Sequence, residues 1–276
     1  TKYEHAINTG SKSKAIFWQE QLNKIYSEPE SIKIQIAQFN PIVGDIKSNA
    51  LKMLNLINEA NESGAHLIVF PELAITGYPP EDLLFREGFI KQVNDEISNL
   101  CNLVPSAITI LFGAPSQADG FLFNSAYCIQ SNRVTHIYNK QELPNYGVFD
   151  EKRYFTPGKG PGLFEVKDKK IALTVCEDIW HTKAIRQASR RGADLVLNLN
   201  ASPFHRNKRQ ERKTLLESYA DKFQLPIVYA NQIGGQDELV FDGASMVVCP
   251  NSGLKVQLDS FKVDNKVVEF SENSEG

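Results

Sequence analysis

The short run 66–70 (HLIVF), which ends at Pro71, constrains the fold of this chain more than any other part of the sequence. A strand with one solvated face alternates polar and apolar residues, whereas this run is continuously apolar. It therefore predicts a strand that is covered on both sides. The stretch 32–39 (IKIQIAQF) does alternate, as a half-buried strand must, and we expect the folded domain to begin there.

Strand-like and helix-like segments alternate along the rest of the chain. The helix-like segments are 48–62, which Gly64 ends, 182–191 and 209–223. The further strand-like segments are 107–112, 124–129, 134–138, 171–175, 194–199, 227–231 and 244–248. Strands interleaved with helices on a chain of this length predict an α/β layered sandwich.

One domain is enough to explain the chain, because residues 32–270 show no repeat, low-complexity tract or break in composition. We interpret residues 1–31 as an N-terminal extension or arm, with a short helix over residues 15–25. Residues 271–276 are expected to form a C-terminal tail or linker.

The composition excludes several classes of protein. With 42% hydrophobic and 23% charged residues, the chain resembles a globular protein and not a disordered or coiled-coil one. Its net charge is −3 and it has no long basic run, so neither nucleic acid nor an anionic membrane surface is an expected partner. No apolar stretch approaches the roughly 20 residues that cross a bilayer, and no signal peptide is recognisable, which favours a cytoplasmic location. The four Cys and five His form no metal-ligand or disulfide pattern.

Cys176 is the first candidate for a chemical role because of its position. The strand-like segment 171–175 runs directly into it, and a helix-like segment follows. Backbone N–H groups at such a strand-to-helix turn can lower a thiol pKa and can stabilise an oxyanion, which suits a nucleophile. By itself, however, a cysteine after a strand is more often an inert core thiol. Cys128, inside a predicted strand, lacks this setting.

Two further polar residues occupy similar strand ends. Glu72 follows the apolar run 66–70, and Lys140 closes the strand-like segment 134–138. Open α/β sheets usually place their sites at the carboxyl ends of strands, so Glu72 could serve as a general base and Lys140 could stabilise developing negative charge. Separately, each is more simply a helix-cap or surface charge. Three such placements together favour an active site.

The sequence around these three residues resembles the carbon–nitrogen hydrolase (nitrilase) superfamily, in which Glu, Lys and Cys occur in this chain order. Longer strings are similar to the glutaminase domain of glutamine-dependent NAD synthetases. They are 71–84 (PELAITGYPPEDLL), 140–151 (KQELPNYGVFDE), 174–180 (TVCEDIW) and 231–245 (NQIGGQDELVFDGAS). The resemblance covers roughly residues 32–248, and it implies a four-layer αββα sandwich of the nitrilase type.

The same resemblance implies hydrolysis of the glutamine side-chain amide. Glu72 would take the proton of Cys176, whose thiolate would attack the amide carbon. Lys140 and the backbone N–H of Glu177 would hold the oxyanion. A thioester would then be hydrolysed by water that Glu72 activates, releasing glutamate after ammonia has left, and no cofactor is needed for this reaction.

A substrate-binding set is also implied by the resemblance. Its members are Tyr146, Glu177, Ser202 and Lys208, of which one acidic and one basic residue suit the two charged groups of glutamine. Glu151 corresponds to the second glutamate of the superfamily, which is expected to position the catalytic lysine. The simpler alternative is a solvated surface pair for the acidic and basic residues of the set, Lys208 among them, and an ordinary loop carboxylate for Glu151.

Two positions depart from the family pattern. Asn207 stands where glycine is usual, but asparagine tolerates the left-handed backbone that a glycine would supply. Glu142 stands where a His or a neutral residue is common, which adds a negative charge near Lys140.

Partners and cofactors are implied only for a larger assembly. In NAD synthetases a second domain, a carbon–nitrogen ligase, uses ATP and a nicotinate dinucleotide and consumes the ammonia. No phosphate-loop pattern is present, so the pair Gly234 and Gly235 is interpreted as a turn. The sequence up to Gly276 shows no such second domain, and three explanations stay open: an excised glutaminase portion, a synthetase on a separate chain, or a free-standing amidase.

The expected partners are therefore glutamine and a synthetase domain or subunit, and we expect at least a homodimer. Two alternatives are a stand-alone nitrilase-type amidase that acts on another amide and a non-catalytic interaction subunit with the same fold. Intact Glu72, Lys140 and Cys176 argue against the second of these.

Overall fold

The computed structural model of the chain describes residues 16–18 and 31–271. Contacts between residues separate the unit Ile32–Glu269 from residues 1–31 and 270–276. Residues 16–18 are helical, and the rest of the helix expected over residues 15–25 lies outside the described residues. The division into an arm (residues 1–31), a hydrolase domain (32–270) and a tail (271–276) stays a prediction.

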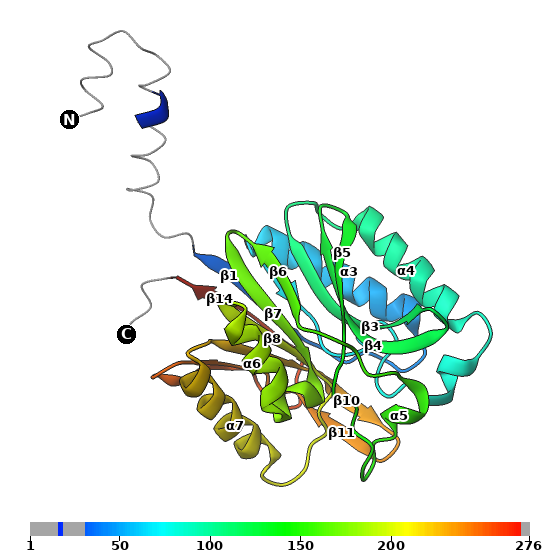
Figure 1. Cartoon of the computed structure of the whole chain (residues 1–276). Helices are drawn as coiled ribbons and strands as arrows, with labels where there is room; N and C mark the ends of the chain where they lie inside the picture. Colours follow the sequence, from blue (N-terminus) through cyan, green and yellow to red (C-terminus); the bar gives the residue numbers. More distant parts are fainter. Residues whose placement is uncertain (1–15, 19–30, 272–276) are drawn as a thin grey trace. The chain divides into compact units, whose positions relative to one another are not determined.

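Two six-stranded sheets form the centre of the unit Ile32–Glu269 (Figure 1). In spatial order, the first contains β14 (Asp264–Phe270), β1 (Ile32–Gln38), β2 (Leu67–Val69), β3 (Thr109–Ala118), β4 (Phe121–Gln130) and β5 (Arg133–Asn139). The second contains β13 (Gly253–Gln257), β12 (Met246–Cys249), β9 (Ile227–Asn231), β8 (Leu195–Asn200), β7 (Lys169–Val175) and β6 (Gly162–Val166).

Each sheet has a parallel centre and antiparallel flanks. In the first sheet β1, β2 and β3 are parallel, and β4 and β5 continue antiparallel. In the second sheet β7, β8 and β9 are parallel, with β6 and β12 antiparallel beside them. The central strand β2 is completely buried, as its continuous apolar sequence predicts. The carboxyl ends of the parallel strands in each sheet therefore share one edge.

Helix α3 (Ile46–Glu62) shows why the connections between parallel strands are helical. Its buried Ile46, Ala50, Met53 and Ile57 recur at three- and four-residue spacing, so they share one face. Burying side chains such as Met53 and Ile57 contributes about 1.5–3 kcal/mol each. The helix begins at Asp45, whose carboxylate accepts the Ser48 N–H at 3.3 Å, and ends before Gly64, as predicted.

A second long helix, α4 (Phe89–Leu103), is absent from the sequence-based prediction, although its apolar positions carry a clear signal. Phe89, Val93, Ile97 and Leu100 are buried and lie on one face. The remaining helices are α6 (Thr182–Arg190), α7 (Lys208–Phe223) and the short segments η1 (Glu81–Phe85), α5 (Glu151–Tyr154) and η2 (Cys176–Trp180).

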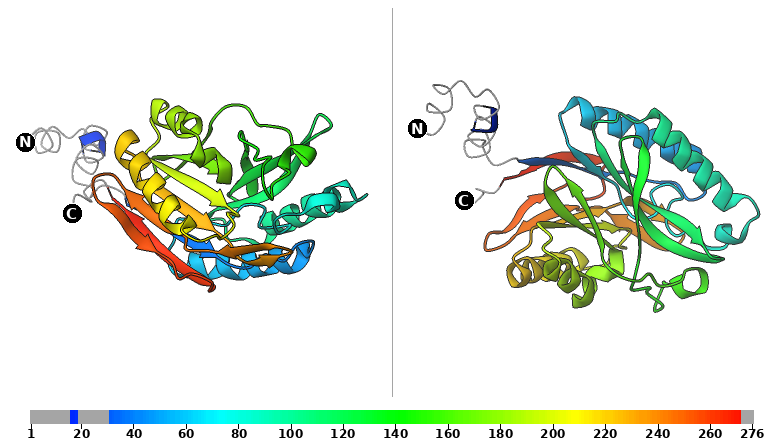
Figure 2. Two further views of the ribbon diagram at one scale, coloured as in Figure 1. Left: turned by 90° about the horizontal axis from the view of Figure 1, so that it is seen from below. Right: turned by 45° about the horizontal axis from the view of Figure 1, so that its top comes forward.

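The four layers of the expected sandwich are confirmed. Helices α3 and α4 pack with the first sheet in one apolar core, and α6 and α7 pack with the second sheet in another. Figure 2 shows the two helical layers on opposite sides of the sheets, and contacts between β1 and β9 and between β4 and β7 join the sheets face to face. No helix among the described residues is sufficiently long and apolar to span a membrane.

The pair Gly234 and Gly235 does not form the expected turn. Both residues lie in β10 (Ile233–Gln236), which pairs with β11 (Leu239–Asp242) in a hairpin whose turn is at Asp237 and Glu238. Gly234 has φ = 120°, and a Cβ there would lie 2.3 Å from Oδ1 of Asn40. The glycine is therefore required by a close approach within a strand, which a Gly-Gly pattern alone does not distinguish from a turn.

Candidate active site

Cys176 lies where the sequence predicted, immediately after β7 and at the start of η2. Its φ of 41° is left-handed, a conformation that costs a residue with a side chain on the order of 1–3 kcal/mol. Such strained turns recur where a nucleophile must be presented at the end of a strand. Only 7% of the residue is exposed, so the thiol lies at the bottom of a recess.

Glu72 lies three residues beyond the end of β2, and its position depends on a glycine in β3. A Cβ on Gly113 would be 2.1 Å from the Leu73 nitrogen, so only glycine lets the turn after β2 pack so closely on β3. Two backbone bonds fasten the turn there, because the Gly113 N–H donates to the Pro71 oxygen at 3.1 Å and the Ile75 N–H donates to the Gly113 oxygen at 3.3 Å.

Lys140 joins Glu72 and Glu151 in one buried cluster. Its Nζ lies 2.8 Å from Oε1 of Glu72, 2.8 Å from Oε1 of Glu151 and 3.0 Å from Oε2 of Glu151. The side chains of Lys140 and Glu72 are both fully buried. The hydroxyl of Tyr78 also donates to Oε1 of Glu151, at 2.9 Å.

Asn124, in β4, is a member of this cluster that the sequence-based prediction missed. Its Nδ2 donates to Oε1 of Glu72 at 2.7 Å and lies 3.4 Å from Oε2 of Glu151, so one amide group spans both carboxylates. Its backbone oxygen accepts the Lys140 N–H at 2.8 Å. The available signal in the sequence was an asparagine within a segment that is predicted to be a strand.

The electrostatics of the cluster follow from its composition, which is two carboxylates and one ammonium in a buried space. Burial alone would lower the pKa of Lys140, but the charges of Glu151 and Glu72 outweigh it and raise the pKa. Burial raises the pKa of Glu151, although Lys140 opposes the shift. Burial and the charge of Glu72 also raise the pKa of the Cys176 thiol, which is therefore neutral near pH 7.

Asp178, two residues after Cys176, is a second residue that the prediction did not single out. Its Oδ2 accepts from the Val175 N–H at 2.9 Å and the Tyr138 hydroxyl at 2.8 Å. Its Oδ1 accepts from the N–H groups of Gln141 at 3.0 Å and Glu142 at 2.9 Å. One buried carboxylate thus ties the turn that carries Cys176 to the segment that carries Lys140.

The turn after β8 also contacts Glu72. The backbone N–H of Ala201 donates to Oε2 of Glu72 at 3.0 Å, and the Glu72 N–H lies 3.4 Å from the Asn200 oxygen. Because β2 belongs to the first sheet and β8 to the second, these bonds cross between the sheets. Both oxygens of Glu72 are therefore held in a fixed orientation.

A cavity of about 390 Å³ opens above Cys176. All four residues of the predicted binding set line it, namely Tyr146, Glu177, Ser202 and Lys208. Glu72, Lys140 and Glu151 are not among the residues that line the cavity, because they lie buried behind it. Cys176 and the four predicted binding residues therefore line one cavity, and Glu72, Lys140 and Glu151 form the buried cluster described above.

Charged and aromatic groups meet at the cavity wall. The Tyr146 hydroxyl donates to the Glu177 carboxylate at 3.0 Å, and burial together with the charge of Glu177 raises the pKa of Tyr146 to about 12. Nζ of Lys208 lies 3.8 Å from the centre of the Trp180 ring, and partial burial lowers the pKa of this lysine. An acidic and a basic group thus face the same space.

The two departures from the family pattern have local explanations. Asn207 has φ = 73° immediately before α7, which is the left-handed backbone that a glycine would supply. The side chain of Glu142 is partly exposed, and its carboxylate is 3.3 Å from Nζ of Lys183. Among residues 16–18 and 31–271, no three His, Cys, Asp or Glu side chains are arranged to hold a metal ion.

The four-layer fold, in which Glu72, Lys140 and Cys176 each follow the carboxyl end of a strand, defines a hydrolase of the nitrilase type. Residues 33–265 match the carbon-nitrogen hydrolase family, and the chain belongs to this family.

Individual relatives agree with this assignment. The chain is 41% identical over 242 residues to the glutamine-dependent NAD(+) synthetase of Acinetobacter baylyi, a match that covers 87% of this chain and 44% of the relative. The relative from Aquifex aeolicus, with the same name, is 39% identical over 84% of this chain and 41% of its own length. The chain thus spans less than half the length of these curated relatives.

Solved structures show the same relationship. The glutamine-dependent NAD+ synthetase of Acinetobacter baumannii, in complex with adenosine diphosphate, superposes with a TM-score of 0.86 at 42% identity, over 89% of this chain and 46% of that one. An amidase mutant from Nesterenkonia sp. AN1, with an acetamide moiety on its active-site cysteine, gives a TM-score of 0.79 at 27% identity, over 87% and 90% of the two chains.

Proposed function

We propose that this chain hydrolyses the side-chain amide of glutamine through a thioester on Cys176 and supplies the ammonia for NAD synthesis. The observation that carries the proposal is the single recess in which Cys176, Glu177, Ser202 and Lys208 face one cavity, backed by the buried cluster of Lys140. The names of the relatives support glutamine as the substrate.

In the proposed reaction Glu72 accepts the proton of the neutral Cys176 thiol as the thiolate attacks the amide carbon. Lys140 and the backbone N–H of Glu177 stabilise the oxyanion of the tetrahedral intermediate. Glu72 returns the proton to the departing ammonia and then activates the water that cleaves the thioester. Glu151 and Asn124 keep Glu72 and Lys140 aligned through the bonds described above.

Glutamine is preferred to simple amides in this proposal because its two charged groups have counterparts in the cavity. The α-ammonium group pairs with Glu177 and the Tyr146 hydroxyl, and the α-carboxylate pairs with Lys208 and Ser202. Opposite charges placed at a fixed separation discriminate against aliphatic amides, which leave both protein charges without a partner.

The partner in this proposal is a synthetase domain or subunit, in which ATP and a nicotinate dinucleotide are used; the glutaminase reaction itself needs no cofactor. Association of this chain with itself, at least as a dimer, and a cytoplasmic location are further parts of the proposal. The match to 90% of the length of the Nesterenkonia amidase keeps a stand-alone amidase as the second candidate.

Ammonia release from glutamine, asparagine and acetamide distinguishes these candidates. We expect glutamine to be preferred, Cys176→Ala to abolish turnover, and Cys101→Ala, which changes a thiol outside the cavity, to retain it. A diazoketone analogue of glutamine should label Cys176 even when no synthetase is present. Preference for acetamide or asparagine would favour the second candidate, and absence of both turnover and labelling would refute an active site.

A further inference from the structure

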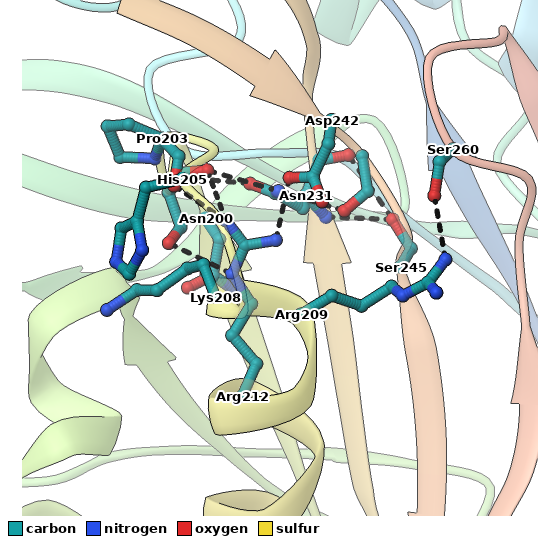
Figure 3. A network of polar contacts seen from close by, with 12 residues as sticks. Asn200, Pro203, His205, Lys208, Arg209, Arg212, Asn231, Asp242, Ser245 and Ser260 are labelled. Atoms are coloured by element: carbon teal, nitrogen blue, oxygen red, sulfur yellow. Dashed lines mark hydrogen bonds and ion pairs between the residues drawn. The ribbon is translucent and has the colours of Figure 1, made fainter.

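Arg212, in α7, is the largest fully buried side chain of the described residues, and the proposed reaction does not use it. An isolated guanidinium is costly to bury, so its contacts must compensate. Nη1 donates to Oδ1 of Asp242 at 2.7 Å, and the two side chains are 0% and 2% exposed. Figure 3 shows Arg212 together with Asp242 and Pro203, and dashed lines mark the polar contacts.

The other donors of Arg212 bind the cavity wall itself. Nη2 donates to the backbone oxygen of Ser202 at 2.7 Å and to that of Pro203 at 2.9 Å. Nε donates to the Ser202 hydroxyl oxygen at 3.2 Å. Ser202 and Pro203 both line the cavity above Cys176, so one guanidinium holds two consecutive residues of the wall.

Asn231 also binds the backbone of Ser202. Its Oδ1 accepts the Ser202 N–H at 2.9 Å, and its Nδ2 donates to the Gly243 oxygen at 2.9 Å. The backbone N–H, the carbonyl oxygen and the side-chain oxygen of Ser202 are therefore all engaged by buried groups. Since Nε–H of Arg212 is a donor, the Ser202 oxygen acts as its acceptor and the hydroxyl proton is left to donate elsewhere.

We propose that Arg212 is a positioning residue that fixes Ser202 and Pro203 in the cavity wall and orients the Ser202 hydroxyl as a donor to the carboxylate of the bound amide substrate. The inference rests on the proposed function for the identity of that substrate. Arg212 also lies one helical turn after Lys208, so it fastens to the same wall the end of α7 that presents this lysine to the cavity. Arg212 itself is not among the residues that line the cavity.

The first test is Arg212→Lys, which keeps a positive charge beside Asp242 but replaces the planar fork of donors by a single ammonium. We expect KM for glutamine to rise roughly tenfold or more, since at least two hydrogen bonds to the wall are lost, whereas kcat changes less than about threefold. Arg209→Lys is the matched control, because Arg209 belongs to the same helix but only its Nη1 approaches Ser260, at 3.5 Å, outside this cavity. Unchanged KM in Arg212→Lys would overturn the proposal.

Labelling of Cys176 separates positioning of the wall from general damage. The diazoketone analogue of glutamine needs the wall, whereas iodoacetamide needs only an accessible thiol. We expect Arg212→Lys to slow labelling by the analogue and to leave labelling by iodoacetamide unchanged. Equal slowing of both reactions, with a fall in kcat, would assign Arg212 a merely structural role and would contradict the inference.

A second variant covers the case in which Arg212→Lys does not fold. The double variant Arg212→Met with Asp242→Leu replaces the ion pair by apolar side chains, an exchange that buried pairs often tolerate. It should fold and still show the raised KM, because Ser202 and Pro203 have lost their donors. A KM equal to that of the unaltered protein would again overturn the proposal.

Amide hydrogen exchange makes the test independent of the substrate. If the unaltered protein neither turns over glutamine nor is labelled by the analogue, the proposed function fails, but exchange at residues 201–206 still reports whether Arg212 holds the wall. We expect faster exchange there in Arg212→Lys and no change at residues 174–178. Unchanged exchange at residues 201–206 would overturn the inference whatever the substrate is.

Discussion

Replacing Asp178 by Asn tests whether the turn of Cys176 and the segment of Lys140 are held together by one carboxylate. The four groups around Asp178 donate two hydrogen bonds to each of its oxygens. The amide of asparagine has one oxygen and one NH₂ group. The NH₂ group must therefore replace either Oδ1 or Oδ2, and at that position it faces two hydrogen-bond donors. At the Oδ2 position the Tyr138 hydroxyl can rotate and accept, but the Val175 N–H cannot.

The expected loss of stability follows from these contacts. One buried N–H without an acceptor costs about 1–3 kcal/mol, and the remaining bonds lose the strengthening that a charged acceptor gives. We therefore expect Asp178→Asn to lower the free energy of unfolding by about 2–4 kcal/mol. For a unit of about 240 residues this corresponds to a fall in Tm of roughly 5–15 °C.

The assay combines Tm with turnover of glutamine. Turnover should fall more than about tenfold, because Lys140 and Cys176 lose their common anchor and small displacements of reacting groups are expensive. Asp194→Asn is the matched control, since this exposed carboxylate accepts one backbone N–H, that of Lys170, at 2.6 Å. It should change stability by no more than about 0.5 kcal/mol. Unaltered Tm and turnover in Asp178→Asn would refute the reasoning.

Three further predictions follow from the site and the hairpin. Glu72→Gln should lower kcat about 10²–10⁴-fold by removing the general base, while iodoacetamide still alkylates Cys176 at alkaline pH; retained turnover would contradict the role of Glu72. The pKa of Cys176 is raised, so its thiol stays neutral to higher pH than an ordinary thiol, whose pKa is ~8.5. The rate of alkylation of Cys176 should therefore still increase with pH above ~8.5, and a rate that becomes constant near neutral pH would contradict this. Gly234→Ala should lower stability by about 1–3 kcal/mol through the close approach of Asn40, measured by thermal unfolding, whereas Gly235→Ala, with its nearest contact at 3.4 Å, should not; equal effects would show that the close approach is unimportant.

The positions of Glu72, Lys140 and Cys176 at strand ends could be predicted because they depend on local pattern. Glu72, Lys140 and Cys176 each follow a strand that is recognisable from its apolar residues, and carboxyl ends of strands gather at one edge. The binding residues came from resemblance to a family, and the structure places them around the same cavity. Their individual roles stay predictions.

Asn124 and Asp178 were missed for a physical reason. Their importance comes from partners far away in the chain, such as Glu72 for Asn124 and Tyr138 for Asp178. A polar residue in a strand or beside a nucleophile has several ordinary explanations until those partners are known. Arg212 is similar, since a charged residue in a polar helix normally faces water.

The order of the strands could not be predicted from local sequence patterns either, because it depends on residues that are far apart in the chain. Strand β14 lies at the other end of the unit in sequence but beside β1 in the first sheet. None of its residues is buried, so its sequence gives no sign of which strand it joins. The helix α4, in contrast, was missed although Phe89, Val93 and Ile97 already indicate an amphipathic helix.

The division of the site between two sheets has a consequence for how activity is acquired during folding. Glu72 and Lys140 follow strands of one sheet and Cys176 follows a strand of the other. Neither sheet by itself therefore carries both Glu72 and Cys176. Recovery of turnover after dilution from denaturant should therefore report the docking of the two sheets, and it should lag behind the recovery of far-ultraviolet circular dichroism.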